Sequence, residues 1–143
     1  MTETAAHAQW RANAPKKLVA VKLIVKSEKG RILLVKPTYK PTWQFPGGGV
    51  ELSEAPVEAL IREVNEELGM KVKEQEDKLV GVVFQPKDDA VLIIYEFQRN
   101  LDESTVLQLQ KDELEAYQFA SPTEVPGLVA DCYHDFWVGY SSR

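Results

Sequence analysis

The sequence predicts one α/β domain in which helices lie on the faces of a mixed β-sheet. Three observations carry this prediction: the length of 143 residues suits a single domain, short β-branched apolar runs are separated by turn residues, and two later stretches repeat apolar residues at helical spacing. We place the domain at residues 17–143. Residues 1–16 are small and polar apart from Trp10 and are expected to form a loosely ordered arm.

The first two elements of the domain are predicted strands. Leu18–Val25 and Ile32–Val35 are apolar and rich in β-branched residues, which is typical of buried strands. The Ser-Glu-Lys-Gly sequence at 27–30 between them is typical of a turn. We therefore expect these two strands to form a hairpin.

The segment 56–68 carries the strongest helical pattern in the chain. Pro56 suits a first helical turn, where its missing N–H costs nothing. Gly69 suits the residue just beyond the end of a helix. Apolar residues recur at helical spacing and predict a core-facing stripe made of Val57, Leu60, Ile61, Val64 and Leu68.

The remaining elements complete the predicted sheet and its second helical layer. Leu79–Phe84 and Val91–Phe97 are predicted strands joined across 85–89, and a shorter strand is expected near Tyr117–Ala120. Apolar and aromatic residues between 129 and 140 fit an amphipathic helix. The order of elements therefore gives a mixed sheet with helices on its faces.

Three glutamates on the predicted helix 56–68 form the most informative cluster of charge. Glu63, Glu66 and Glu67 are spaced so that their carboxylates share one helix face, away from the apolar stripe. Hard oxygen ligands of this kind suit Mg²⁺ or Mn²⁺ bound against substrate phosphates. For the glutamates alone, a solvated acidic helix surface is the simpler interpretation.

The sequence before this helix bears on the choice between a metal site and a solvated acidic surface. The run Pro46-Gly47-Gly48-Gly49 is able to bring backbone close to a ligand, although a tight turn would also explain it. Arg62 stands among the acids and is able to pair with Glu54 or Glu66. A surface ion pair is the simpler interpretation of that arginine.

The segment from Gly48 to Met70 resembles the Nudix box, G-x5-E-x7-R-E-U-x-E-E-x-G-U, in which U is a bulky apolar residue. All nine specified positions are filled, by Gly48, Glu54, Arg62, Glu63, Val64, Glu66, Glu67, Gly69 and Met70. The preceding Trp43-Gln44-Phe45-Pro46-Gly47 and the order of elements are similar to the family over residues 17–140.

The resemblance implies an α/β/α sandwich with a central mixed β-sheet flanked by helices. It also implies an enzyme, a pyrophosphohydrolase that uses Mg²⁺, with Mn²⁺ as the alternative, to cleave a nucleoside diphosphate linked to another group X. Glu63, Glu66 and Glu67 would bind the metal, with the Gly47 carbonyl as a further ligand. Arg62 and Glu54 would pair and brace the loop against the helix.

The general base is not fixed by the resemblance, because the family places it either in the box or in a later loop. Glu66 is the candidate within the box. Glu113, in the sequence KDELEAYQF, is the candidate outside it, although a solvated loop residue would also account for it.

The residues before the glycine run supply candidates for substrate binding. Tyr39, Trp43 and Phe45 are able to stack on a base, and Lys36 is able to meet a phosphate. Core packing for the aromatics and an exposed position for the lysine are equally good interpretations. Pro86 resembles a mark of the subgroup that hydrolyses ADP-ribose, and oxidised nucleoside triphosphates stay open as substrates.

Charge and composition limit the partners that we expect. The formal net charge of −5 disfavours nucleic acid and anionic membranes as partners. A single cysteine, Cys132, excludes an internal disulfide, and there is neither a membrane-spanning apolar run nor a signal pattern, so we expect a cytoplasmic protein that acts on a small nucleotide. A homodimer is compatible with the sequence. The alternative function is a module that senses a nucleotide without hydrolysing it.

Overall fold

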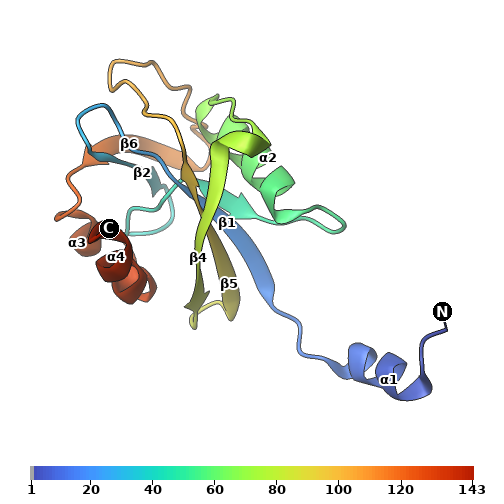
Figure 1. The fold of residues 1–143 in the computed structure, drawn as a ribbon. Helices are drawn as coiled ribbons and strands as arrows, with labels where there is room; N and C mark the ends of the chain where they lie inside the picture. The colour runs from blue at the N-terminus through green and yellow to red at the C-terminus, as the bar shows by residue number, and fades with distance from the viewer. Residues whose placement is uncertain (1) are drawn as a thin grey trace.

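The computed structural model describes residues 2–143 and shows an α/β domain with a helix projecting from its N-terminal end (Figure 1). In chain order the elements are helix α1 (Ala5–Asn13), strands β1 (Leu18–Ile24), β2 (Ile32–Pro37) and β3 (Gly47–Gly49), helix α2 (Pro56–Leu68), the 3₁₀ helix η1 (Glu74–Glu76), strands β4 (Asp77–Gln85), β5 (Ala90–Phe97) and β6 (Leu114–Ala120), helix α3 (Val125–Leu128), the 3₁₀ helix η2 (Asp131–Tyr133) and helix α4 (His134–Ser141).

The strands form two sheets. The larger sheet has the order β3-β1-β5-β4, and it is mixed because β1 runs parallel to β5 whereas the other pairs are antiparallel. The smaller sheet is the antiparallel pair β2-β6. The predicted hairpin of the first two strands is therefore wrong beyond its turn: the Leu33 N–H donates to the Val25 carbonyl at 3.0 Å, but β1 already has β3 and β5 as partners, so β2 pairs with β6 instead.

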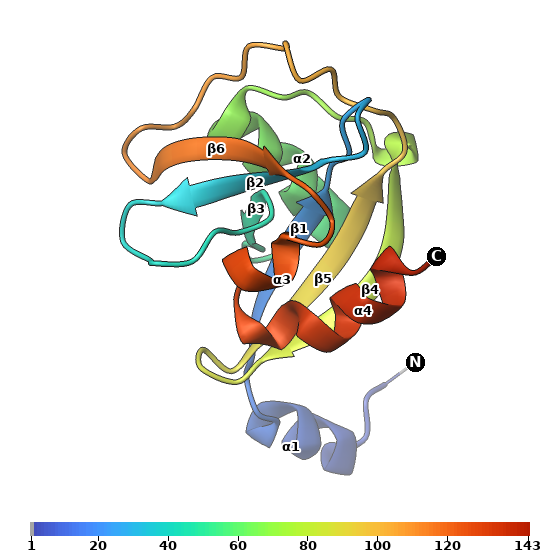
Figure 2. The ribbon, with the colours of Figure 1, turned by 90° about the vertical axis from the view of Figure 1, so that its left-hand side faces the viewer.

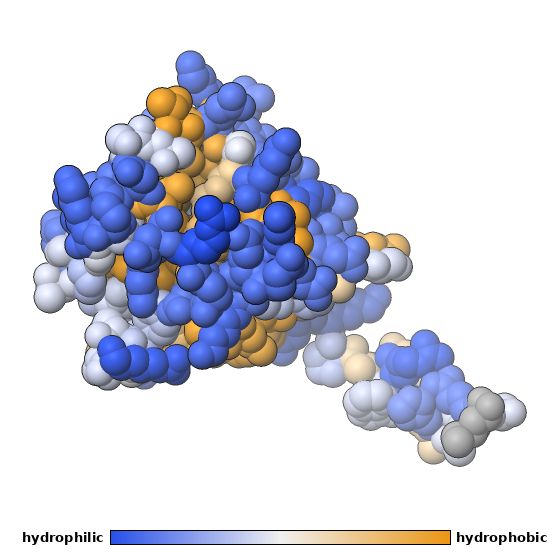
Figure 3. Space-filling view, turned by 45° about the horizontal axis from the view of Figure 1, so that its top comes forward, coloured by the Kyte–Doolittle hydropathy of each residue, from blue (hydrophilic) through white to orange (hydrophobic). Residues whose placement is uncertain are grey.

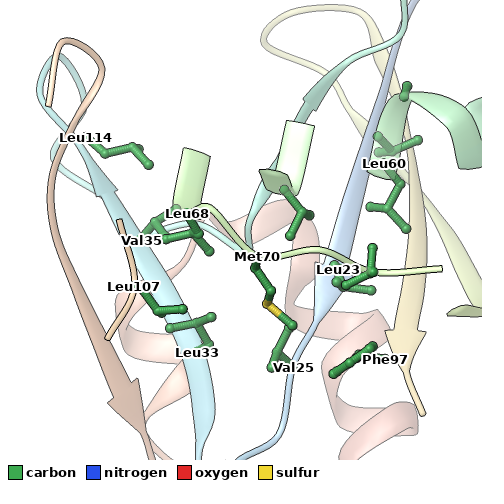
Figure 4. Close-up of a cluster of buried hydrophobic side chains, with 14 residues drawn as sticks. Leu23, Val25, Leu33, Val35, Leu60, Leu68, Met70, Phe97, Leu107 and Leu114 are labelled. Atoms are coloured by element: carbon green, nitrogen blue, oxygen red, sulfur yellow. The ribbon is translucent and has the colours of Figure 1, made fainter. Parts of the chain in front are cut away.

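Alternation along the strands divides the core into two layers. Leu23 and Leu33 point toward α2, whereas Ile24 and Leu34 point toward the helices α3 and α4. Figure 2 shows α3 and α4 lying across the sheet on the side away from α2. In Figure 4, Met70 lies between the side chains of β1 and those of β2, where it joins the two parts of the α2 core. The predicted α/β/α sandwich is thus confirmed.

Helix α2 forms as the sequence predicts. Pro56 is its first residue, and Gly69 ends it in the left-handed conformation with φ 65°. Leu60, Val64 and Leu68 are buried against β1 and β2. One face of the helix is therefore anchored in the core, which fixes the direction of the opposite, acidic face.

The predicted helix near the C-terminus is broken. The chain makes the 3₁₀ turn η2 before α4 begins at His134. Trp137 and Tyr140 are both buried and close the second core layer. Phe45 lies against this layer, edge-on to Tyr133 at 5.1 Å and stacked on Trp137 at 5.8 Å between ring centroids.

The N-terminal segment forms a short helix, where the sequence suggests a loosely ordered arm. Thr4 caps α1 by accepting from the His7 N–H at 3.1 Å, and Glu3 pairs with Arg11 at 2.9 Å. No residue of α1 is buried, and Trp10 is 64% exposed. Figure 3 shows this helix standing apart from a domain face that is mostly hydrophilic. Within residues 2–143, no helix combines the length and apolar character needed to span a membrane.

Candidate active site

The glycine strand β3 and the helix α2 meet through Glu67. The Gly47 N–H donates to Glu67 Oε1 at 2.7 Å, so the short strand holds the carboxylate directly. Glu67 is only 7% exposed. Burial disfavours the charged form and raises the pKa of Glu67 to about 7, against the opposing attraction of Lys22. The acidic face therefore includes a buried carboxylate with a raised pKa, held in place by the glycine strand.

Glu63 lies one helical turn before Glu67 and approaches the next glycine. A Cβ placed on Gly48 would lie 2.5 Å from the Glu63 carboxylate carbon, so this position has no room for a larger side chain unless Glu63 moves. Burial raises the pKa of Glu63, and the hydrogen bond from Arg62 opposes that shift. The glycine run therefore lies in close contact with the acidic face of the helix and does not form an isolated turn.

Arg62 ties the loop before α2 to the helix. Its Nε and Nη2 donate to the two carboxylate oxygens of Glu54 at 2.8 and 2.9 Å, and Nη2 also donates to the Gly49 carbonyl at 3.0 Å. A further bond of 2.9 Å reaches Glu63 Oε1. The hydrogen bond from Arg62 lowers the pKa of Glu54 to about 2. Arg62 therefore contacts Glu54 and the Gly49 carbonyl from helix α2.

A cavity of about 260 Å³ brings the acidic residues together. Glu63 and Glu67 line it from α2, and Glu113 lines it from the loop before β6. Glu66 is not part of this lining: its side chain is 50% exposed and its Oε2 lies 3.4 Å from Arg62 Nη1. Both candidate bases are exposed, but Glu113 lines the cavity and Glu66 does not.

The residues of this cavity suit a divalent cation in their chemistry. Carboxylates and the Gly47 carbonyl are the hard oxygen donors that Mg²⁺ and Mn²⁺ prefer. A cation would also offset the unfavourable charge of the half-buried Glu63 and the buried Glu67. Within residues 2–143, no three acidic, histidine or cysteine side chains are close enough together to hold a metal ion, and Glu66 Oε2 lies 3.4 Å from Arg62 Nη1.

A second cavity of about 630 Å³ adjoins the acidic one. Residues of β1, of the segment 49–53 before α2 and of the β4-β5 hairpin form much of its wall, together with Tyr133. The two cavities have five lining residues in common: Ala20, Lys22, Lys40, Gln44 and Gly49. The size suits a small-molecule ligand, for which cavities of roughly 300–1,000 Å³ are usual.

The sequence reasoning missed Lys22, Lys40 and Gln44 as candidates. Lys22 is the clearest omission, because a lysine inside the apolar run Leu18–Val25 is a signal that could have been used. It is only 8% exposed, and its Nζ donates to Gln44 Oε1 at 3.2 Å. Nothing comparable in the sequence marks Lys40 or Gln44.

The predicted substrate-binding residues fall into different places. Tyr39 lines the acidic cavity and is 71% exposed. Lys36 donates to the Pro37 carbonyl and to Glu115 Oε1, each at 3.0 Å, so its ammonium braces the loop. Trp43 packs against the second core layer, and Phe45 is fully buried in it. Stacking of Phe45 on a substrate base is therefore contradicted by its burial.

Fold and site together define the class: an α/β/α hydrolase domain in which an acidic helix and a glycine strand form one site. The family model described as the NUDIX domain matches residues 16–135. The chain belongs to the Nudix family and is a Nudix-type hydrolase. Members of this family act on nucleotides and generally use a divalent metal.

Individual relatives agree with this assignment. A "MutT-like protein" of Streptomyces ambofaciens is 30% identical over 87% of this chain and 77% of its own length. An RNA pyrophosphohydrolase of Halorhodospira halophila is 48% identical, but the match covers only 35% of this chain and 28% of that protein. The crystal structure of a MutT protein from Methanosarcina mazei superimposes with a TM-score of 0.73 at 23% identity over 90% of this chain and 97% of that one, which shows the shared fold.

We expect Gly48→Ala to lower kcat by about 10-fold to 100-fold, which corresponds to roughly 1.4–2.7 kcal/mol of lost transition-state stabilisation, while leaving the fold intact. The added methyl would displace the flexible end of Glu63 rather than backbone. Steady-state kinetics and thermal unfolding would measure the two effects. Gly139→Ala is the control, because its methyl meets nothing within 4 Å. Full activity in the Gly48 variant would contradict the role of this contact.

Proposed function

We propose that this protein is a metal-dependent pyrophosphohydrolase that cleaves the diphosphate linkage of small nucleotides carrying a second group X. The observation that carries the proposal is the junction of two cavities, one acidic and one larger and partly apolar. A nucleoside fits the larger cavity and a diphosphate fits beside the acidic helix. The net charge of −5 favours a small nucleotide over an RNA chain.

Glu63, Glu67 and the Gly47 carbonyl, which line the acidic cavity, are the proposed ligands of Mg²⁺, with Mn²⁺ as the alternative. Glu66 is the further proposed ligand, and its side chain would turn away from Arg62 to join them. When bound, the cation neutralises phosphate charge and makes a water more acidic. Arg62 holds Glu63 at 2.9 Å and, through Glu54, fixes the loop that carries Gly48 and Gly49. These contacts keep the glycine backbone and the helix at constant separation, so the substrate diphosphate meets a preorganised site.

Glu113 is the proposed general base, because its side chain lines the acidic cavity together with Glu63 and Glu67. Its carboxylate would take the proton from the water that attacks phosphorus. We expect Glu113→Gln to lower kcat by about 10²-fold to 10⁴-fold, the usual contribution of a positioned base. Rapid-quench or steady-state kinetics would measure it. Full activity in Glu113→Gln would reject Glu113 as the base.

The proposal is tested with purified protein and a panel containing ADP-ribose, the common nucleoside triphosphates and their oxidised forms, each with Mg²⁺ and with EDTA. We expect monophosphate release from at least one compound with Mg²⁺ and none with EDTA. The panel also separates hydrolysis from nucleotide sensing. Binding without turnover across the whole panel would overturn the proposed reaction in favour of the sensing module.

A further inference from the structure

Lys22 lies at the centre of the larger sheet, where a lysine is unusual. It pairs with Gly47 of β3 on one side and with Ile94 of β5 on the other. Its neighbours Val21 and Leu23 are fully buried. Burying a charged group is costly unless polar partners satisfy it. The presence of an ammonium here therefore calls for partners that the sheet itself does not provide.

The protein supplies one of the hydrogen-bond partners that the Lys22 ammonium requires. An ammonium has three N–H donors. Among residues 2–143, the ammonium of Lys22 makes one hydrogen bond, to Gln44 Oε1 at 3.2 Å. Gln44 is itself fixed, because its backbone N–H and carbonyl both bond to Val35 at 2.8 Å. Two N–H groups of Lys22 are therefore left for a group that enters the site.

The side chain of Lys22 also stands at a specific point between the two cavities. It lines the acidic cavity together with Glu67, and it lines the larger cavity together with Leu92 and Tyr133. Lys40, on the loop after β2, lines both cavities as well. A nucleotide that occupies both cavities has to place the phosphate attached to its nucleoside beside these two lysines.

We propose that Lys22 is a substrate-binding residue whose ammonium donates to the phosphate that joins the nucleoside to the rest of the substrate. The inference rests on the proposed function, because that function places the nucleoside and the diphosphate in neighbouring cavities. Hydrogen bonds between an ammonium and a phosphate are charge-assisted and short. The acidic residues would then act at the phosphate that is distant from the nucleoside, and Lys22 would bind the phosphate attached to the nucleoside.

A purely structural role is the competing explanation, in which Lys22 only balances the charge of Glu67. The two roles differ in what they do to phosphate recognition without metal. Isothermal titration calorimetry in EDTA would compare AMP, GMP, CMP and UMP with the corresponding nucleosides. We expect the wild-type protein to bind at least one monophosphate about 10-fold to 100-fold more tightly than its nucleoside, the range of a charged hydrogen bond.

Lys22→Met removes the ammonium while keeping much of the side-chain length, and Lys22→Gln is a second neutral variant in case the first does not fold. We expect the affinity for the monophosphate, relative to its nucleoside, to fall to less than about 3-fold in either neutral variant. Lys26→Met is the matched control: Lys26 follows the same strand but pairs with Glu96 at 3.5 Å, outside both cavities. The Lys26→Met variant should keep the full preference for monophosphate over nucleoside.

Two results would overturn the inference. One is a neutral Lys22 variant that keeps the wild-type preference for monophosphate over nucleoside, and the other is a wild-type protein that shows no such preference. Hydrolysis of the panel is measured separately, so a variant that retains the preference in an active enzyme would reject the role of Lys22 and leave the proposed reaction standing. Loss of the preference in a protein without turnover would support Lys22 and reject the reaction.

Discussion

Glu67→Gln is expected to lower the rate of hydrolysis at least about 100-fold, or roughly 2.7 kcal/mol in the barrier, and to stabilise the metal-free protein at pH 7.5. The substitution removes a charge from the acidic cavity but keeps an oxygen able to accept from the Gly47 N–H. The loss of activity follows because a neutral amide is a poor ligand for a divalent cation. The gain in stability follows because the buried charge is gone.

The pH dependence of this gain follows from the pKa of Glu67, which burial raises from 4.5 to about 7 in the folded protein. Between these values the folded state binds more protons than the unfolded state, so the free energy of unfolding falls as pH rises. That loss is complete above about pH 7 and reaches about 1–3 kcal/mol. The glutamine variant lacks this titration, so its advantage should be absent near pH 4.5 and complete at pH 7.5.

Urea unfolding of both proteins in EDTA at pH 4.5, 6 and 7.5 would measure the effect. The control is Glu58→Gln, on the exposed first turn of α2 and outside both cavities, which should change neither activity nor the pH dependence. Equal stability of Glu67→Gln and wild type at pH 7.5 would show that burial of this carboxylate carries no such cost.

Gly47→Ala is expected to destabilise the fold by about 3 kcal/mol or more, through a clash and a strained backbone together. A Cβ at this position would lie 1.9 Å from the Val21 carbonyl oxygen, which belongs to the central strand and has no freedom to move. The glycine also has φ of 145°, which L side chains rarely adopt.

Gly48→Ala is the natural comparison, since it adds the same methyl one residue later. Chemical denaturation should show a large loss of stability for the Gly47 variant and little for the Gly48 variant, whereas kinetics should show a loss of activity in both. Wild-type stability in Gly47→Ala would mean that β3 moves away from β1 without cost, which the β1-β3 register does not suggest.

The sequence predicted α2 and its two faces because the pattern is local. Pro56, Gly69 and the apolar stripe all act within one helix, and the structure confirms them. The strands were also predictable from their composition. Their pairing was not, because the choice of β6 as the partner of β2 depends on β1 already being occupied on both sides.

The candidate site was likewise predictable from the sequence only in part. The acidic helix and the glycine strand were expected to meet, and the bond between Gly47 and Glu67 shows how they do. The sequence left two side-chain directions open, and the structure resolves them: Phe45 packs in the core, and Arg62 contacts both Glu54 and Glu66. The larger cavity was also missed, since its walls combine residues 49–53 of the box with segments that are far from them in the chain and carry no motif.

The origin of these cavity walls bears on how such a domain acquires new substrates. Helix α2 contributes Glu63 and Glu67 to the acidic cavity and no residue to the larger one. The larger cavity draws on β1, the segment 49–53 before α2, the loop after β2, the β4-β5 hairpin and the segment before α4, and it shares five lining residues with the acidic cavity. Substitutions in β5 or in the segment before α4 are therefore able to reshape the larger cavity without touching the acidic helix, whereas changes at the shared residues affect both cavities.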